Sequence, residues 1–322
     1  MLKYLIRRFY QTVIVLFVVV SLLFILFRMM PGDPAAMLID QTIDELTQKR
    51  LLAEWGLDAP LYKQYLIYLK NLLQLNFGVS FFYRKPIWNA LYSTLWNTIA
   101  LMGTGISLAV GMGVLLGAYL GWRRGSRLER FGLILALILR SMPIFWLGII
   151  LLMIFTYWLT LFPTGGMRST GYASSNLFWT YFSLDFLYHM VLPLLVAALH
   201  YLPNPLMVMR TSMLEIRGED FLQFAESIGL PESALMRHCA KNALLPVVTF
   251  VALMAGFALG GQVLLEFIFA WPGMGREMLL AIERRDYPVA QGSFIILSTL
   301  VIFMNFLVDI LYCYIDPRIK YA

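Results

Sequence analysis

The sequence has few charged residues and very few cysteines and histidines. Charged residues make up 14% of its 322 residues, while hydrophobic residues make up 60%. A soluble domain could not cover that much apolar surface, so the composition excludes this class and predicts a chain that crosses a membrane several times. Two cysteines, at positions 239 and 313, are too few for a disulfide framework. Three scattered histidines give no pattern typical of a metal site.

Motifs of catalysis and of nucleotide binding are also missing. No segment reads G-x-x-x-x-G-K-[ST], and no predicted inside loop is long enough to hold a nucleotide-binding domain. No nucleophile and base stand in a recognisable arrangement. We therefore expect no enzyme activity, no metal and no cofactor in this chain, so energy for its function must come from elsewhere. The net charge of +6 gives no support to nucleic-acid binding, because the cations gather at one predicted membrane face.

The hydrophobic runs predict an all-α polytopic membrane protein with six transmembrane helices. The expected spans are residues 9–30, 95–122, 131–162, 186–209, 243–269 and 291–314. Basic clusters lie at residues 3–8, 123–130, 210–241 and 318–320, which places both termini on the same, cytoplasmic side. The expected regions are an N-terminal transmembrane helix (1–30), an external region (31–94), a five-helix core (95–316) with an inside loop at 210–242, and a cytoplasmic tail (317–322).

The first apolar run also opens like a secretory signal peptide, with basic residues before it and Ala35 and Ala36 after it. The run approaches the ~20 residues that a span needs, and further spans follow it. We therefore interpret it as a retained first helix with its amino end inside.

Small residues in the second span have two possible roles. Gly113, Gly117 and Gly121 recur at intervals of four, so they lie on one face of a helix. Such a face lets another helix approach closely, and close packing drives helix association in lipid. The pattern fits an interface with another subunit and ordinary packing inside this chain equally well.

Four polar residues are candidates for a transport pathway. Arg140 lies in the third span beside Pro143, which we expect to kink that helix; Arg140 either snorkels to the inner surface or lines the pathway. His200 and Asn204 lie in the fourth span, which three prolines interrupt, so it forms either a pathway wall or a kinked helix satisfied by its neighbours. Asn305 lies one turn from Asp309. An acid at that position is expected to act either as a proton relay or as a contact between helix ends.

A polar interruption at residues 218–246 has a helical pattern of its own. Phe221, Phe224, Ala225 and Ile228 recur at i, i+3, i+4 and i+7, which predicts one apolar face on a short amphipathic helix. Gly229 can end that helix in a left-handed conformation, and Pro231 can begin a second one. Taken alone, this pattern is also that of a solvated surface helix.

The same stretch resembles the cytoplasmic EAA loop of permease subunits in binding-protein-dependent ABC importers of the dipeptide, oligopeptide and nickel family. The family pattern E-D-[YF]-x-x-x-A-x-x-x-G-L is matched by Glu219, Asp220, Phe221, Ala225, Gly229 and Leu230. The later pattern H-A-x-x-N-A-x-L-P is matched by His238, Cys239, Asn242, Ala243, Leu245 and Pro246. Where the family usually has A-R-A-K-G, this chain has Ala-Glu-Ser-Ile-Gly at 225–229.

Further signatures of this family follow in the expected order. They are P-G-D-P at 31–34, an imperfect G-D-[LF]-G-x-S at 75–80, S-x-P-x-F-W-L-G at 141–148, F-x-W-P-G-[LM]-G-R at 269–276 and R-D-Y-P at 285–288. The last two lie in one predicted outside connection. They either dock an external partner or cap the helix bundle, and the candidate docking residues are Trp271, Pro272, Gly273, Arg285, Asp286 and Tyr287.

The resemblance implies a Type I ABC importer permease fold in the bacterial cytoplasmic (inner) membrane, with residues 31–94 in the periplasm. It implies a heterodimer with a homologous second permease, two cytoplasmic ATPase subunits that bind ATP and Mg, and a periplasmic solute-binding protein. The ATPase-coupling loop would comprise Glu219, Asp220, Phe221, Phe224, Ala225, Gly229 and Leu230.

Short peptides are the expected substrates, with nickel, metal chelates or glutathione as alternatives within the same class. Two other classes stay open. One is an ion-gradient-driven secondary transporter that uses Asp309, His200 or Arg140 as relays. The other is a membrane scaffold without transport activity.

Overall fold

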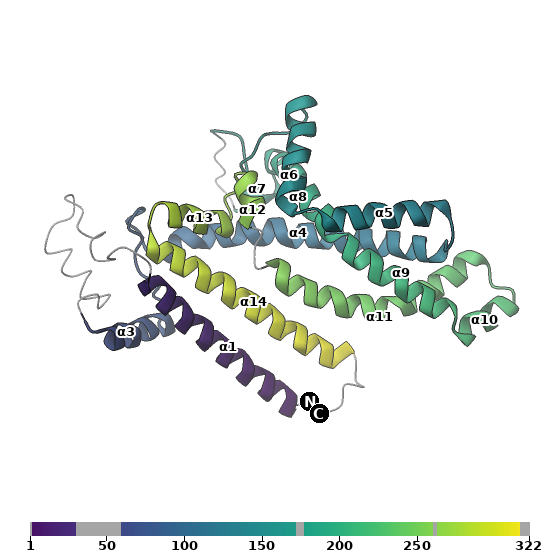
Figure 1. Ribbon diagram of the computed structural model, residues 1–322, viewed down its shortest axis with the longest axis horizontal. Coiled ribbons are helices and arrows are strands. Elements are labelled where there is room, and N and C mark those ends of the chain that lie inside the picture. Colours follow the sequence, from purple (N-terminus) through teal and green to yellow (C-terminus); the bar gives the residue numbers. More distant parts are fainter. Residues whose placement is uncertain (1, 30–58, 172–176, 260–262, 316–322) are drawn as a thin grey trace.

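The computed structural model describes residues 2–29, 59–171, 177–259 and 263–315, and the regular elements in these ranges are helices (Figure 1). The first half of the chain forms α1 (Leu2–Met29), α3 (Leu61–Leu73), α4 (Ile87–Trp122), α5 (Arg127–Ser141), α6 (Ile144–Leu152) and the π-helix η1 (Met153–Trp158). The second half forms α7 (Leu177–Phe182), α8 (Leu184–Tyr201), α9 (Pro203–Arg217), α10 (Asp220–Ser227), α11 (Glu232–Leu259), α12 (Val263–Ile268), α13 (Met274–Glu283) and α14 (Tyr287–Ile315).

The described helices fit a protein that crosses the membrane several times. Four stretches are long and apolar enough to cross alone: Tyr4–Met29, Ile87–Trp122, Leu184–Tyr201 and Tyr287–Ile310. The bent pair of α5 with α6 and η1 makes a fifth if it counts as one span. An all-helical membrane protein is therefore confirmed, while six spans with cytoplasmic termini stay a prediction.

The third apolar stretch is broken into two helices at a sharp corner. The chain turns by 104° between α5 and α6–η1, so the expected kink at Pro143 is a corner. Met142, the residue before the proline, has an extended backbone (φ −76°, ψ 128°), as proline imposes on its predecessor. Beyond the corner, α6 packs beside α8, while α5 runs along α4 and α9 (Figure 1).

Several helix boundaries differ from the expected ones because proline starts helices here. Pro86 precedes α4, which begins eight residues before position 95. Pro203 and Pro205 lie in the first turn of α9, where the missing N–H groups cost nothing, so α9 continues to Arg217. The inside loop predicted at 210–242 is therefore mostly helical, comprising the end of α9, all of α10 and the start of α11.

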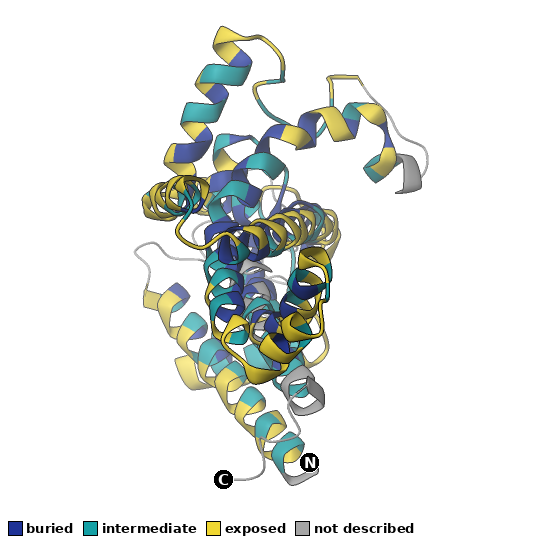
Figure 2. Ribbon diagram, turned by 90° about the vertical axis from the view of Figure 1, so that its right-hand side faces the viewer, coloured by how far each residue is buried: buried dark blue, intermediate teal, exposed yellow. Residues whose placement is uncertain are grey.

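Helix α4 is the central element, and its glycines hold α8 and α9 close. A Cβ atom added to Gly113 would lie 2.7 Å from Pro205 Cγ, and one added to Gly121 would lie 2.7 Å from Met213 Cβ. A Cβ at Gly117 would overlap the carbonyl oxygen of Leu206. The structure thus decides between the two roles of this glycine face: it packs against helices of the same chain. In an end-on view, buried residues (dark blue) gather on the inner faces of the helices (Figure 2).

Helices α1 and α14 run antiparallel along one side of the bundle. Arg8 forms an ion pair with Asp309 (3.2 Å) near one end, and Phe27 contacts Tyr287 and Phe294 near the other. The start of α1 and the end of α14 therefore lie at the same end of the molecule (Figure 1). Of the two roles considered for Asp309, the structure shows the contact between helix ends.

We expect Gly117→Ala to destabilise the protein by about 1–3 kcal/mol, because the new methyl group must push α9 away from α4. Gly111→Ala is the matched control. Gly111 lies on the same helix, but a Cβ atom added there would have no neighbour within 4 Å. Thermal unfolding in detergent, followed by size-exclusion chromatography, checks both variants. Equal melting temperatures for the two would contradict the close approach of α4 and α9.

Candidate functional site

The predicted coupling stretch forms a separate short helix at one tip of the molecule (Figure 1, right). α10 follows Glu219 and ends before Gly229, whose φ of +86° is the left-handed value expected there. The N–H of Leu230 donates back to the carbonyl oxygen of Ala225 (3.2 Å), which closes the turn toward α11. The end of the amphipathic helix at Gly229 and the start of the next helix after Pro231 were therefore predicted from these two residues.

α10 has one apolar face turned inward and another turned outward. Leu222 is buried at 4% exposure in a cluster with Met213, Leu235 and Cys239, and Ala225 packs against that cluster. The outward side chains are Phe221, Phe224 and Ile228, which are 45%, 67% and 61% exposed. The predicted single face therefore needs one correction: Ala225 belongs to the inward face, because Leu222, three residues earlier, anchors the helix there.

Polar contacts fasten this tip to the end of α4. The guanidinium of Arg217 donates to the carbonyl oxygen of Trp122 (2.7 Å) and lies 4.7 Å from the centre of its ring. The Trp122 indole N–H donates to Glu232 at the start of α11 (2.9 Å). Burial raises the pKa of the Cys239 thiol, which stays protonated and donates to the carbonyl oxygen of Met213 (3.4 Å). Helices α4, α9 and α11 thus hold α10 in place.

A buried ion pair joins α5 to α9 above this tip. The carboxylate of Glu129, which is 4% exposed, accepts hydrogen bonds from Nε (2.9 Å) and Nη2 of Arg210 and from the backbone N–H of Gly125. Ser126 caps α5 by accepting from the N–H of Glu129 (3.1 Å). The pattern S-x-x-E at 126–129 is a capping box, so a local sequence signal for this site existed.

The structure brings three of the four pathway candidates to one junction. Arg140 is exposed at the end of α5, with Nη1 3.9 Å from Met207 Sδ on α9. His200 lies near the backbone of Met142 at the α5–α6 corner, and its buried Nδ1 has no hydrogen-bond partner among the described residues. Asn204 is half-buried in the first turn of α9. Asn305 lies apart from them, half-buried on α14.

The candidate docking segment at the opposite end packs tightly onto α4. Trp271 is fully buried, and its indole N–H donates to the carbonyl oxygen of Asn97 (3.0 Å). The amide of Asn97 donates to the carbonyl oxygen of Pro272 (2.8 Å) and accepts from the hydroxyl of Tyr181 (2.9 Å). This segment was expected either to dock an external partner or to cap the helix bundle. These contacts show that it caps the end of the bundle beside α4.

Glycines in this segment make room for a buried carboxylate that sequence reasoning missed. Glu266 on α12 is fully buried and accepts from the Thr98 hydroxyl (2.6 Å) and from the N–H of Arg276 (2.9 Å). A Cβ at Gly273 would overlap this carboxylate, and one at Gly275 would lie 3.0 Å from it. An acid inside an expected apolar span was the available signal.

Two signatures that lie far apart in the sequence bind each other at the same end. Asp286 is buried and accepts from the Ser80 hydroxyl and from the N–H groups of Phe81 (3.3 Å) and Phe82 (3.1 Å). The Ser80 oxygen in turn accepts from the N–H of Tyr83 (2.8 Å). Asp286 thus fixes the turn before α4, while Tyr287 is buried against α1.

An exposed aromatic and basic cluster lies on this turn. The Tyr83 hydroxyl donates to Glu277 (2.8 Å) and accepts from Arg284 (3.1 Å), whose guanidinium lies 4.2 Å from the Phe82 ring centre. Burial, followed by the hydrogen bond to the Glu277 carboxylate, raises the pKa of Tyr83 and keeps its hydroxyl protonated. We name as the basic rim the exposed residues Arg84, Lys85, Arg284 and Arg285. Of these, sequence reasoning had selected Arg285 alone.

We expect Asp286→Ala to loosen residues 80–85, because three donors lose a charged acceptor, worth about 1.5–3 kcal/mol. Tryptic cleavage after Arg84 should become about tenfold faster or more. Glu283→Ala, an exposed neighbour, is the control and should be cleaved at the wild-type rate. An unchanged rate in Asp286→Ala would show that the turn does not depend on this carboxylate.

Comparisons with known proteins find similar sequences along the whole chain. Residues 113–321 match the family described as "Binding-protein-dependent transport system inner membrane component", and residues 1–102 match the N-terminal model of such a membrane component. The di/tripeptide transport system permease protein DppB of Pseudomonas aeruginosa (strain UCBPP-PA14) is 36% identical over 100% of this chain and 99% of its own.

Two further relatives are similar over their full lengths. The dipeptide transport system permease protein DppB of Escherichia coli (strain K12) is 35% identical over 100% of this chain and 99% of its own. The oligopeptide transport system permease protein AppB of Bacillus subtilis (strain 168) is 33% identical over 100% of both chains. The chain therefore belongs to the family of binding-protein-dependent transport system inner membrane components and is a permease subunit of an ABC importer.

Proposed function

We propose that this permease forms, with a homologous second permease, the pathway by which an ATP-driven importer carries short peptides across the bacterial cytoplasmic membrane. Two cytoplasmic ATPases would bind ATP and Mg beneath it, and a periplasmic solute-binding protein would deliver the peptide. The peptide substrate is supported by relatives named for di/tripeptide, dipeptide and oligopeptide transport, which are 33–36% identical along the whole chain. Six spans, with both termini in the cytoplasm, belong to the same proposal.

The observation that carries the proposal is the outward face of α10. Phe224 and Ile228 are large apolar side chains, each more than half exposed, at the tip of a helix that the rest of the chain holds firmly. A soluble surface gains nothing from such side chains, whereas an apolar groove on an ATPase would bury them. The interfacial anchors would thus be Phe221, Phe224 and Ile228.

The packing around α10 would transmit a movement of the bound ATPase to the membrane helices. α10 is joined to α9 through Gly218 and Glu219, and α9 lies in the glycine face of α4. A displacement of α10 would therefore move α9 against α4, and Glu129 would carry α5 along through Arg210. This is the two-state element that ATP binding would shift between inward-open and outward-open forms.

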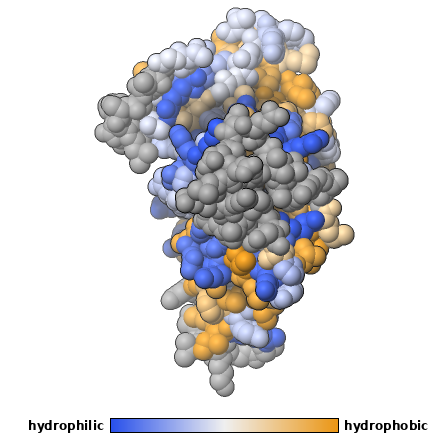
Figure 3. Space-filling model, turned by 90° about the vertical axis from the view of Figure 1, so that its left-hand side faces the viewer, coloured by the Kyte–Doolittle hydropathy of each residue, from blue (hydrophilic) through white to orange (hydrophobic). Residues whose placement is uncertain are grey.

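The basic rim is the part of the outer end that we assign to the solute-binding protein. Its cations are exposed, and Asp286 and Glu277 hold its two loops together. Seen from this end, strongly hydrophilic patches (blue) lie beside apolar ones (Figure 3). The partner surface that complements this rim carries acidic side chains, because opposite charges steer association.

The ion-gradient alternative is weakened by the contacts of its main candidate relay. Asp309 is engaged by Arg8, so a proton taken up there would break a contact between α1 and α14. His200 and Arg140 lie at another junction, on helices α8 and α5. We therefore keep the ATP-driven importer as the proposal.

We expect Phe224→Asp to abolish copurification of the ATPases while the second permease stays bound, since losing a buried anchor costs about 2 kcal/mol or more. Gly229→Pro should act alike, because proline cannot adopt a φ of +86°. Gln223→Asp, exposed on the same helix, is the charge-matched control and should retain the ATPases. Pull-down of the tagged complex with peptide uptake in vesicles measures both effects. Retained ATPases in Phe224→Asp would refute the docking role of α10.

We expect Lys85→Glu with Arg285→Glu to slow association with the binding protein by about tenfold at low salt, and less at high salt. Lys241→Glu, an exposed cation near the opposite tip, is the control. Stopped-flow association with the complex in nanodiscs gives the rates. A reduction that did not depend on salt would point to a disrupted turn and not to lost electrostatic steering.

A further inference from the structure

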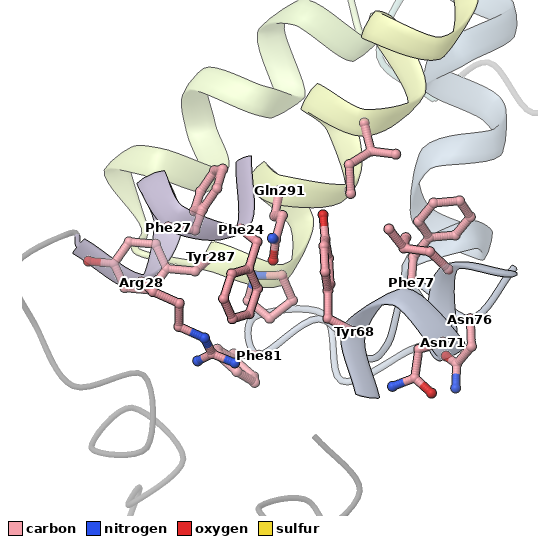
Figure 4. Close-up of a pocket in the computed structure, with 14 residues that line it drawn as sticks. Phe24, Phe27, Arg28, Tyr68, Asn71, Asn76, Phe77, Phe81, Tyr287 and Gln291 are labelled. Atoms are coloured by element: carbon pink, nitrogen blue, oxygen red, sulfur yellow. The ribbon is translucent and has the colours of Figure 1, made fainter. Parts of the chain in front are cut away.

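A cavity opens at the outer end between α1, α3 and α14, away from the coupling tip and the basic rim. It encloses about 70 Å³, which is room for a small polar group and not for a whole lipid or peptide. Aromatic rings of Phe24, Phe27 and Phe81 form one part of its wall, and Tyr68 rises from α3 toward Gln291 (Figure 4). The side-chain amides of Asn71, Asn76 and Gln291 add hydrogen-bond donors to this lining.

The contacts of α3 place it at the depth of the outer leaflet. The hydroxyl of Tyr65 forms a hydrogen bond with Ser21 (2.6 Å), and that of Tyr68 donates to the carbonyl oxygen of Val20 (3.3 Å). Both partners precede the end of α1 at Met29 by eight or nine residues, which is about 12–14 Å along the helix axis. The two tyrosine side chains therefore reach from α3 down the outer half of the span, since half a bilayer core is about 15 Å thick.

The outward face of α3 suits a position at the lipid interface. Leu61, Tyr62 and Leu66 are each more than 60% exposed, and they share the helix with the exposed cations Lys63 and Lys70. Large apolar side chains beside lysines are typical of a helix that lies in the headgroup boundary and attracts anionic lipids. The neighbouring outer half of α1 also exposes apolar side chains, at Leu22, Ile25 and Leu26.

Arg28 supplies the charge at this cavity. Its guanidinium lies 5.5 Å from the centre of the Phe24 ring, and it forms no ion pair with any carboxylate in the described part of the chain. The guanidinium is half-buried, and a charge-assisted hydrogen bond would pair it with an anion that enters the cavity. Its place at the end of an apolar span puts that anion at headgroup level.

We propose that this cavity binds the headgroup of an anionic phospholipid from the outer leaflet. The phosphate accepts hydrogen bonds from Arg28 and from the amides of Asn71 and Gln291, while the acyl chains lie along Leu22, Ile25 and Leu26 on α1. The bound headgroup then fills the cavity between α1, α3 and α14 and links α3 to the bundle. This site is independent of the proposed ATPase and binding-protein surfaces, so its failure would leave the proposed function standing.

The test compares purified, delipidated permease complexes in titrations with phosphatidylglycerol, phosphatidylcholine and inorganic phosphate. Native mass spectrometry counts the lipids retained, and thermal unfolding reports the stabilisation. Phosphatidylglycerol should stabilise the wild type more than phosphatidylcholine does, and Arg28→Gln should need about fivefold more of it. Arg28→Lys should keep most of the effect, and Asn71→Leu, on the opposite wall, should weaken it without altering α1.

Arg123→Gln is the matched control, because Arg123 also lies over an aromatic ring, that of Tyr119 (5.1 Å), at the end of a different helix. It should bind phosphatidylglycerol like the wild type. Three outcomes would overturn the proposal: equal affinity in Arg28→Gln and wild type, an equal loss in Arg123→Gln, or the same stabilisation by inorganic phosphate as by phosphatidylglycerol.

Discussion

The close approach of α4 to α9 is the constraint on which the rest of the structure depends. Lipid offers no hydrophobic contrast to hold helices together, so backbone proximity and tight packing must do it. Gly113, Gly117 and Gly121 provide that proximity over two turns of α4. The position of α9, and of the helix α10 that follows it, therefore depends on these three residues having no side chain.

Buried polar groups then fix which helices meet and where. Glu129 with Arg210 joins α5 to α9, Glu266 with Thr98 joins α12 to α4, and Ser80 with Asp286 joins the turn before α4 to the start of α14. Each carboxyl group is buried and receives two or more hydrogen bonds, as buried polar groups require. The glycines set how near the helices come, whereas these pairs set their partners.

The sequence allowed the helical class, most span positions and the end of α10 at Gly229 to be predicted, because hydrophobic period, proline and glycine act locally. The angle at Pro143 was not predictable, since proline fixes one dihedral while contacts of α5 with α9 set the direction of the corner. The Ser80–Asp286 pair links positions 206 apart, which no local pattern reveals. Likewise, the period of α10 located Phe224 on an apolar face, but only the fold shows that Leu222 occupies the inner side.

The contact between α4 and α9 repeats with one spacing on both helices. Gly113, Gly117 and Gly121 meet Pro205, Met209 and Met213, so each glycine faces the residue 92 positions later, and both rows advance by four. A slide of α9 by about one turn, roughly 6 Å, would bring Met209 to the place of Pro205 and Met213 to that of Met209. After such a step, Met209 would face Gly113 and Met213 would face Gly117. Such a slide would break the hydrogen bonds of Arg210 with Glu129 and of Arg217 with the carbonyl oxygen of Trp122, so these two arginines of α9 hold it in the register that the structure shows.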